Sequence, residues 1–178
     1  MKLDLELWKD KELIKKQNRL KARFWNIFSE VGNEVQDNSL LANFNFSKGI
    51  KVSKGNDLIG FPYQVLDIVR NWDEKNGLNI RVLNWFGHGM FLFLYLGHNR
   101  VSKHPFNSLI DLGLIQSKNP DPFDYPGILL LNEGSPEYNK KSDLSVWFKE
   151  INITDQSEKT QAQIFEEIKG LIEILTFA

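Results

Sequence analysis

Residues 90–96, MFLFLYL, carry an apolar side chain at every position. Side chains of a β-strand point alternately to the two faces of a sheet, so Leu92 and Leu94 would face one side while Phe91 and Phe93 face the other. A strand that is apolar on both faces is typical of a sheet interior that is covered on both sides. The run is too short for a membrane span, which needs about 20 apolar residues. The sequence therefore predicts a sheet with two covered faces.

A turn precedes this strand. Gly87, His88 and Gly89 separate it from a second apolar segment, residues 78–86. A two-residue loop of His88 and Gly89 fits the tight turns that hairpins prefer. This loop predicts a hairpin in which Arg81 lies opposite Leu96.

The hairpin bears on the histidines, because it separates two of the three. His88 would lie at its tip and His98 about 30 Å away, at the far end of the second strand. Ligands of one metal ion must all lie within about 2 Å of it. The chain has no cysteine, which also excludes disulfides and thiolate chemistry. We therefore predict no metal site and no cofactor.

Three further segments have the alternation or the β-branched composition of strands: residues 47–55, 62–72 and 145–154. Strands that follow one another through short connections pair antiparallel, since parallel pairs need a long crossover. The first segment is predicted to be an edge strand, because lysines protect such edges from pairing with other chains. These lysines are Lys48, Lys51 and Lys54.

Two amphipathic helices are predicted near the ends of the chain. In the first, apolar residues recur three or four positions apart from Leu13 to Val31, and Gly32-Asn33 is expected to end it. In the second, the apolar stripe runs from Ile164 to Leu175, and Asp155 with Glu158 has the spacing of a capping box.

The predicted fold is therefore α+β, a mostly antiparallel β-sheet with the N- and C-terminal amphipathic helices packed on one face. A single domain spanning residues 1–178 accounts for the length. The other face is covered either by residues 104–141 or by a partner subunit. Within that region, residues 104–116 are expected to contain a short helix and GILLL, residues 127–131, a short strand.

The N-terminal residues are interrupted by charge too often to form the apolar core of a signal peptide. Hydrophobic residues make up 42% of the chain and charged residues 25%, as in ordinary globular proteins. We therefore expect a cytoplasmic protein with no membrane span.

Charge is uneven along the chain. Residues 9–23 hold seven basic residues against two acidic ones, a local charge of +5, while the whole chain carries −1, so the remainder carries −6. A basic helix can bind nucleic acid or an anionic membrane surface. The simpler interpretation is a solvated helix face, because the chain as a whole lacks the high isoelectric point of nucleic-acid-binding domains.

Three charged residues, Asp67, Arg70 and Arg81, fall in segments that are otherwise largely apolar. Charges in such segments are seldom buried unless they are paired, so Asp67 and Arg81 are predicted either to form a structural ion pair or to lie at an exposed strand edge. Alternatively, all three line a ligand pocket together with Tyr63 and Trp85. No catalytic residue can be assigned, and enzymatic activity is left open.

Residues 51–97 contain a series of short motifs in this order: Ser-Lys-Gly, Gly-x-Pro-Tyr, Leu-Asp, Arg, Ile-Arg and Trp-x-Gly. It resembles that of a family of small bacterial proteins, mostly from Bacteroidetes, with no established activity. The resemblance implies that these residues form one structural unit, and it implies no function. The family pattern lacks the histidine at position 88, which argues against a catalytic role for it. The matching positions are Ser53, Lys54, Gly55, Gly60, Pro62, Tyr63, Leu66, Asp67, Arg70, Ile80, Arg81, Trp85 and Gly87.

Three hypotheses follow. The leading one is a non-enzymatic domain that binds itself or another protein through its apolar sheet. The second is a small-molecule binder or enzyme with the pocket named above. The third is binding of nucleic acid or a membrane surface by the basic helix of residues 9–23.

Overall fold

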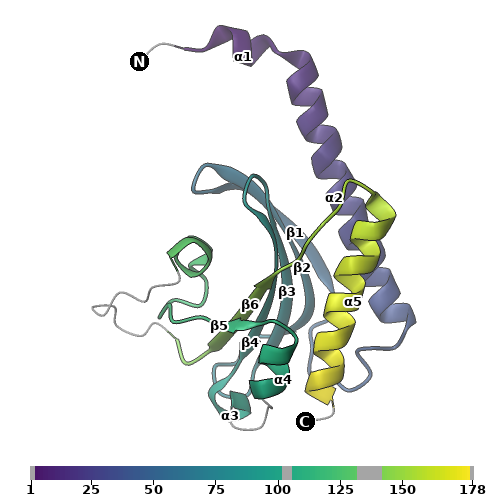
Figure 1. The fold of residues 1–178 in the computed structure, drawn as a ribbon, viewed down its shortest axis with the longest axis vertical. Helices are drawn as coiled ribbons and strands as arrows, with labels where there is room; N and C mark the ends of the chain where they lie inside the picture. Colours follow the sequence, from purple (N-terminus) through teal and green to yellow (C-terminus); the bar gives the residue numbers. More distant parts are fainter. Residues whose placement is uncertain (1–2, 102–105, 132–141, 177–178) are drawn as a thin grey trace.

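The computed structural model describes residues 3–101, 106–131 and 142–176. Two helices begin the chain, a strand-rich part follows, and a helix ends it (Figure 1). The helices are α1 (Leu5–Lys9), α2 (Lys11–Asp37), α3 (His98–Val101), α4 (Phe106–Asp111), the π-helix η1 (Gly127–Leu131) and α5 (Ser157–Thr176). The strands are β1 (Lys51–Leu58), β2 (Phe61–Asn71), β3 (Leu78–Trp85), β4 (Gly89–Leu96), β5 (Ile115–Gln116) and β6 (Ser145–Glu150).

The six strands form one antiparallel sheet in the order β1-β2-β3-β4-β6-β5. The apolar run of residues 90–96 belongs to β4, which lies in the interior of the sheet between β3 and β6. β1 lies at one edge and carries Lys51 and Lys54, as predicted. Together with the terminal helices, this sheet confirms the predicted α+β class.

β3 and β4 form the predicted hairpin, but the predicted register is wrong. Trp85 pairs with Gly89 across a three-residue loop, so Arg81 lies opposite Phe93 and not opposite Leu96. The reason lies in Gly87, whose φ of 86° is left-handed and readily adopted by glycine. The chain reverses around Gly87, and every cross-strand pair moves by three positions.

Helix α2 continues through the predicted stop at Gly32. Its apolar stripe extends to Val35, which is fully buried, so packing continues beyond the glycine. A Cβ atom on Gly32 would lie 3.1 Å from Cγ2 of Ile50, so the glycine permits a close approach instead of ending the helix. The helix ends at Asp37, where the side-chain amide of Asn38 donates to the carbonyl of Glu34 at 2.8 Å.

Helices α2 and α5 pack on the same face of the sheet, as predicted (Figure 1). Ahead of α5, the described hydrogen bonds join Thr154 and Thr160, whose hydroxyl accepts from the Thr154 amide and donates to its carbonyl. The predicted capping box of Asp155 and Glu158 is not among these bonds. The buried residues of this core include Phe28, Val31, Leu66, Ile80, Leu92, Leu94, Ile164 and Ile168.

The opposite face of the sheet is covered by the chain itself. Tyr125 and Ile128, from the segment that contains η1, pack on Trp85, Phe93 and Tyr95. Figure 1 shows this segment and the terminal helices on opposite sides of the sheet. Of the two predicted covers for this face, the described part of residues 104–141 is the one observed.

The secondary structure of residues 106–131 differs from the prediction at one point and agrees with it at another. Residues 127–131 form a π-helix and not a strand. The chain turns helically ahead of it, because the side chain of Asp124 accepts from the Gly127 amide and the Ile128 amide donates to the Asp124 carbonyl. The short helix expected within residues 104–116 is α4. None of the helices in the described ranges has the length and apolar character needed to cross a bilayer.

Candidate functional site

Four of the five predicted pocket residues lie on the same face of the sheet. Tyr63 pairs with Trp85, and Asp67 pairs with Arg81, across β2 and β3. Alternation along the two strands therefore brings these four side chains to the face covered by the η1 segment. Arg70 lies beyond a β-bulge between Asp67 and Val69 and pairs with Asn79. Its side chain is separate because it binds the loop ahead of β1.

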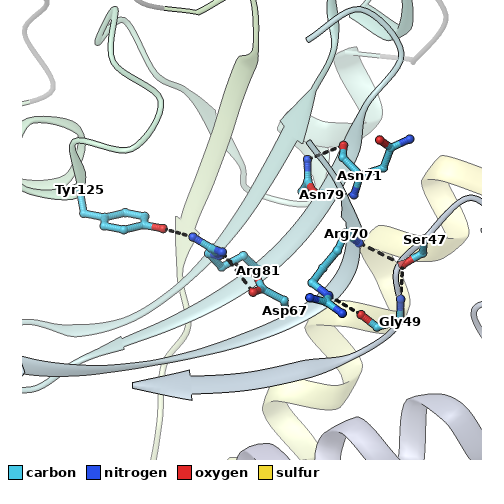
Figure 2. Close-up of polar contacts among 8 residues, drawn as sticks. All are labelled: Ser47, Gly49, Asp67, Arg70, Asn71, Asn79, Arg81 and Tyr125. Carbon is cyan, nitrogen blue, oxygen red and sulfur yellow. Dashed lines mark hydrogen bonds and ion pairs between the residues drawn. The ribbon is translucent and has the colours of Figure 1, made fainter. Parts of the chain in front are cut away.

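Asp67, Arg81 and Tyr125 form one buried polar network (Figure 2). The guanidinium of Arg81 binds the Asp67 carboxylate through Nε at 2.6 Å and through Nη2 at 3.1 Å. Its Nη1 donates to the Tyr125 hydroxyl. The indole of Trp72 lies 4.8 Å from Cζ of Arg81, at cation–π distance. Arg81 thus joins β2, β3 and the η1 segment.

Burial by itself lowers the pKa of Arg81, but the hydrogen bond to Asp67 and the nearby Tyr125 and Asp67 raise the pKa above its ordinary value. Arg81 therefore stays protonated. The side chains of Arg81 and Asp67 are only 17% and 6% exposed, and the arginine already contacts the carboxylate, a hydroxyl and an indole. These contacts are those of a structural ion pair, as predicted by the simpler interpretation.

Tyr95 lies beside this network, close to Tyr125. The residue is fully buried, and its oxygen has no hydrogen-bond partner at normal geometry among the residues that the structure describes. Burial raises the pKa of Tyr95 well above its ordinary value, and the neighbouring Tyr125 raises it further. The side chain therefore stays neutral over the physiological pH range.

Arg70 acts at the sheet edge instead. Its Nε donates to the carbonyl of Gly49 and its Nη2 to that of Lys48, both at 2.6 Å, while its amide donates to the Ser47 hydroxyl. Figure 2 shows this cluster apart from Arg81. Arg70 therefore fixes the loop that leads into β1, and the predicted five-residue pocket is not assembled.

A cavity of about 450 Å³ lies elsewhere, where α2 meets β1 and β2. Tyr63 is the predicted pocket residue that lines it, packed so closely against Gly55 that a Cβ atom there would clash with its ring. Sequence reasoning missed this site, because its walls come from segments about 40 residues apart. The described lining residues are Asn18, Lys21, Ala22, Trp25, Asn26, Lys54, Gly55, Asn56, Pro62, Tyr63, Gln64 and Phe86.

Beyond this cavity the N-terminal part of the chain extends past the sheet (Figure 1). We call α1 and the first part of α2, residues 3–23, the arm. Asp4 and Asp10 cap its two helices by accepting from the amides of Leu7 and Leu13. Between residues 3 and 20 every side chain except Leu13 is exposed. The arm therefore presents both its apolar and its basic residues to solvent.

His88 and His98, the histidines within the described ranges, lie at opposite ends of β4. His88 stacks on Trp85 with ring centroids 3.7 Å apart, and so belongs to the hairpin loop. His98 lies beyond the opposite end of β4, at the start of α3. Over the described ranges, no group of three or more His, Asp or Glu residues is arranged to hold a metal ion.

Comparisons of the chain with protein-family models, with curated proteins and with solved structures gave no match in any of the three. The resemblance of residues 51–97 to small bacterial proteins stays a prediction, and the geometry carries the functional argument.

Proposed function

We propose that this chain is a non-enzymatic domain that associates with a second copy of itself through the arm. The observation that carries the proposal is the exposed apolar surface there: Trp8, Ile14 and Leu20 are 72%, 45% and 48% exposed. Several large apolar side chains exposed in one segment mark an interaction surface.

The apolar stripe of the arm is continuous with the stripe that builds the core. Leu13 and Leu20 lie on the helix face that, further along α2, carries the buried Ile27 and Val31. The stripe therefore faces the side on which the sheet and α5 lie, but extends past them. A flat bilayer on that side would collide with the sheet, whereas a helix of a second copy can reach the stripe.

The charge distribution also favours a second copy of the chain at the arm. The opposite face of the arm is basic, with Lys11, Lys15 and Arg19 among its exposed residues. Residues 9–23 carry +5 and the remainder of the chain −6. In a two-fold symmetric pair, the net positive arm of each copy lies near the net negative remainder of the other, so a long-range attraction acts twice without depending on any one basic residue.

The contact between the two copies would therefore be made by the arm and not by the apolar sheet, which the sequence had predicted as the binding surface. Both faces of that sheet are covered within the chain, one by α2 and α5 and the other by Tyr125 and Ile128. The arm, by contrast, consists of α1 and the part of α2 that extends past the sheet.

Size-exclusion chromatography with light scattering tests the proposal. We expect the wild-type chain to have twice its monomer mass of 20.7 kDa, and the double variant Ile14→Ser, Leu20→Ser to have the monomer mass. The matched control is Arg19→Ser, adjacent to Leu20 but on the basic face, which should retain the dimer. A wild-type monomer at every concentration tested would refute the proposal.

A second candidate is binding of a polyanion such as nucleic acid, which the exposed basic face favours. It predicts a wild-type monomer that heparin retains at low salt and releases as salt rises. Arg19→Ser would then reduce retention, and the Ile14→Ser, Leu20→Ser variant would not. Self-association should thus be lost in the Ile14→Ser, Leu20→Ser variant, and polyanion binding should be weakened by Arg19→Ser.

A further inference from the structure

The cavity at the root of the arm holds unpaired positive charge. Lys21 and Lys54 line it, and the described lining contains no carboxylate. Neither lysine forms an ion pair with any residue that the structure describes. The ammonium of Lys54 lies 5.6 Å from the ring centroid of Trp25, so an aromatic wall holds it beside the cavity. An anion would complete this arrangement.

Gln64 belongs to the wall of the cavity and ties it to helix α2. It is 4% exposed, and its Nε2 donates to the backbone carbonyl of Lys21 at 2.8 Å. This bond holds the turn of α2 that carries Lys21 against β2. The polar wall is therefore ordered before a ligand binds, which lowers the cost of binding.

The remaining lining fits a peptide better than a simple anion. Asn18, Asn26 and Asn56 add amide groups that both donate and accept, which matches the one donor and one acceptor of each peptide unit. Trp25 and Phe86 supply apolar wall for the stem of a side chain. A volume of about 450 Å³ is near the lower end for ligand pockets and suits a short segment.

We infer that the cavity between α2 and the β1–β2 edge binds a short acidic peptide segment, with a carboxylate between Lys21 and Lys54 and its peptide groups at the asparagine amides of the wall. This inference goes beyond self-association, because it needs no second copy. Ile14 and Leu20, on which the proposed dimer depends, do not line the cavity.

Isothermal titration calorimetry on the full chain tests it with three probes: the blocked dipeptide N-acetyl-Glu-Glu-amide, its neutral analogue N-acetyl-Gln-Gln-amide, and inorganic phosphate. The acidic dipeptide should bind at least about tenfold more tightly than the neutral one. Lys21→Gln and Lys54→Gln should each weaken its binding about fivefold. Lys16→Gln, on the same helix but outside the cavity, should leave the affinity unchanged.

Three results would overturn the inference. The first is equal affinity for the two dipeptides, and the second is an affinity for the acidic dipeptide that Lys54→Gln does not change. The third is phosphate binding as tight and as lysine-dependent as that of the acidic dipeptide, which would indicate a general anion site. Lys54 is exposed, so its replacement leaves the fold intact. Repeating the titration with Ile14→Ser, Leu20→Ser separates this inference from self-association, because the acidic dipeptide should bind that variant as it binds the wild type.

Discussion

Arg81 illustrates how one residue can bind two parts of the fold. It donates to Asp67 on the neighbouring strand and to Tyr125 of the segment over the sheet. Removing one partner of a buried ion pair leaves the other charge unpaired, which is more harmful than removing both.

Arg81→Met should therefore lower the free energy of unfolding by about 3 kcal/mol, because Asp67 is left buried and unpaired. The double variant Asp67→Leu, Arg81→Met should be more stable than Arg81→Met alone. Urea denaturation of the two variants and the wild type measures both differences. Equal stability of the single and double variants would contradict the buried-pair interpretation.

Tyr95 gives a prediction about pH. Its pKa in the folded chain is raised, whereas the unfolded chain releases this proton near pH 10. The folded state thus holds the proton more tightly, so this contribution to stability is complete below about pH 10 and is lost as pH rises beyond it. Tyr95→Phe should reduce the loss of stability between pH 9 and pH 11, as followed by urea denaturation.

At neutral pH the same variant should be about as stable as the wild type, because it removes a buried hydroxyl for which the described residues provide no partner at normal geometry. Tyr63→Phe, a half-buried tyrosine of the same sheet face, serves as the control and should retain the alkaline loss. An unchanged pH profile for Tyr95→Phe would contradict the argument.

At the scale of elements, the hairpin depends on the backbone of its loop. Gly87 has a left-handed φ, a conformation that costs other residues about 1–2 kcal/mol, and a Cβ atom there would also lie 3.2 Å from the Phe61 ring. Gly87→Ala should lower the free energy of unfolding by at least about 1 kcal/mol. Gly170→Ala, in the helical interior of α5, is the matched control: its gain in helix propensity offsets the contact of the new Cβ with Leu112 Cδ1 at 3.3 Å, so its effect should be smaller than that of Gly87→Ala. Thermal unfolding of both variants measures the contrast.

The sequence predicted the strands and helices of the main layers, because hydrophobic periodicity is a local property. It offered an ion pair of Asp67 with Arg81 as one interpretation, because charged residues in apolar segments are seldom buried unless they are paired. The hairpin register was predicted wrongly, because the Gly87-His88-Gly89 tripeptide suits loops of different length. Tyr125 was missed, because it lies in a segment without periodicity, and the cavity was missed, because it joins distant segments.

At the scale of the whole molecule, the proposed dimer links stability to concentration. Association that stabilises the folded state raises the melting temperature as protein concentration rises. We expect this dependence for the wild type and its absence in Ile14→Ser, Leu20→Ser, both measured by differential scanning calorimetry over a hundredfold range of concentration. A wild-type melting temperature that does not vary would count against the dimer.

Helix α2 passes from the core into solvent without interruption, from buried Val35 back to exposed Lys11. Starting a helix is the unfavourable step and extending one is not, so the core-packed turns act as a template on which the arm grows. An incoming molecule meets a surface whose backbone is already ordered. Recognition at the arm should then resemble the docking of two rigid bodies, with little of the entropic penalty that accompanies coupled folding and binding.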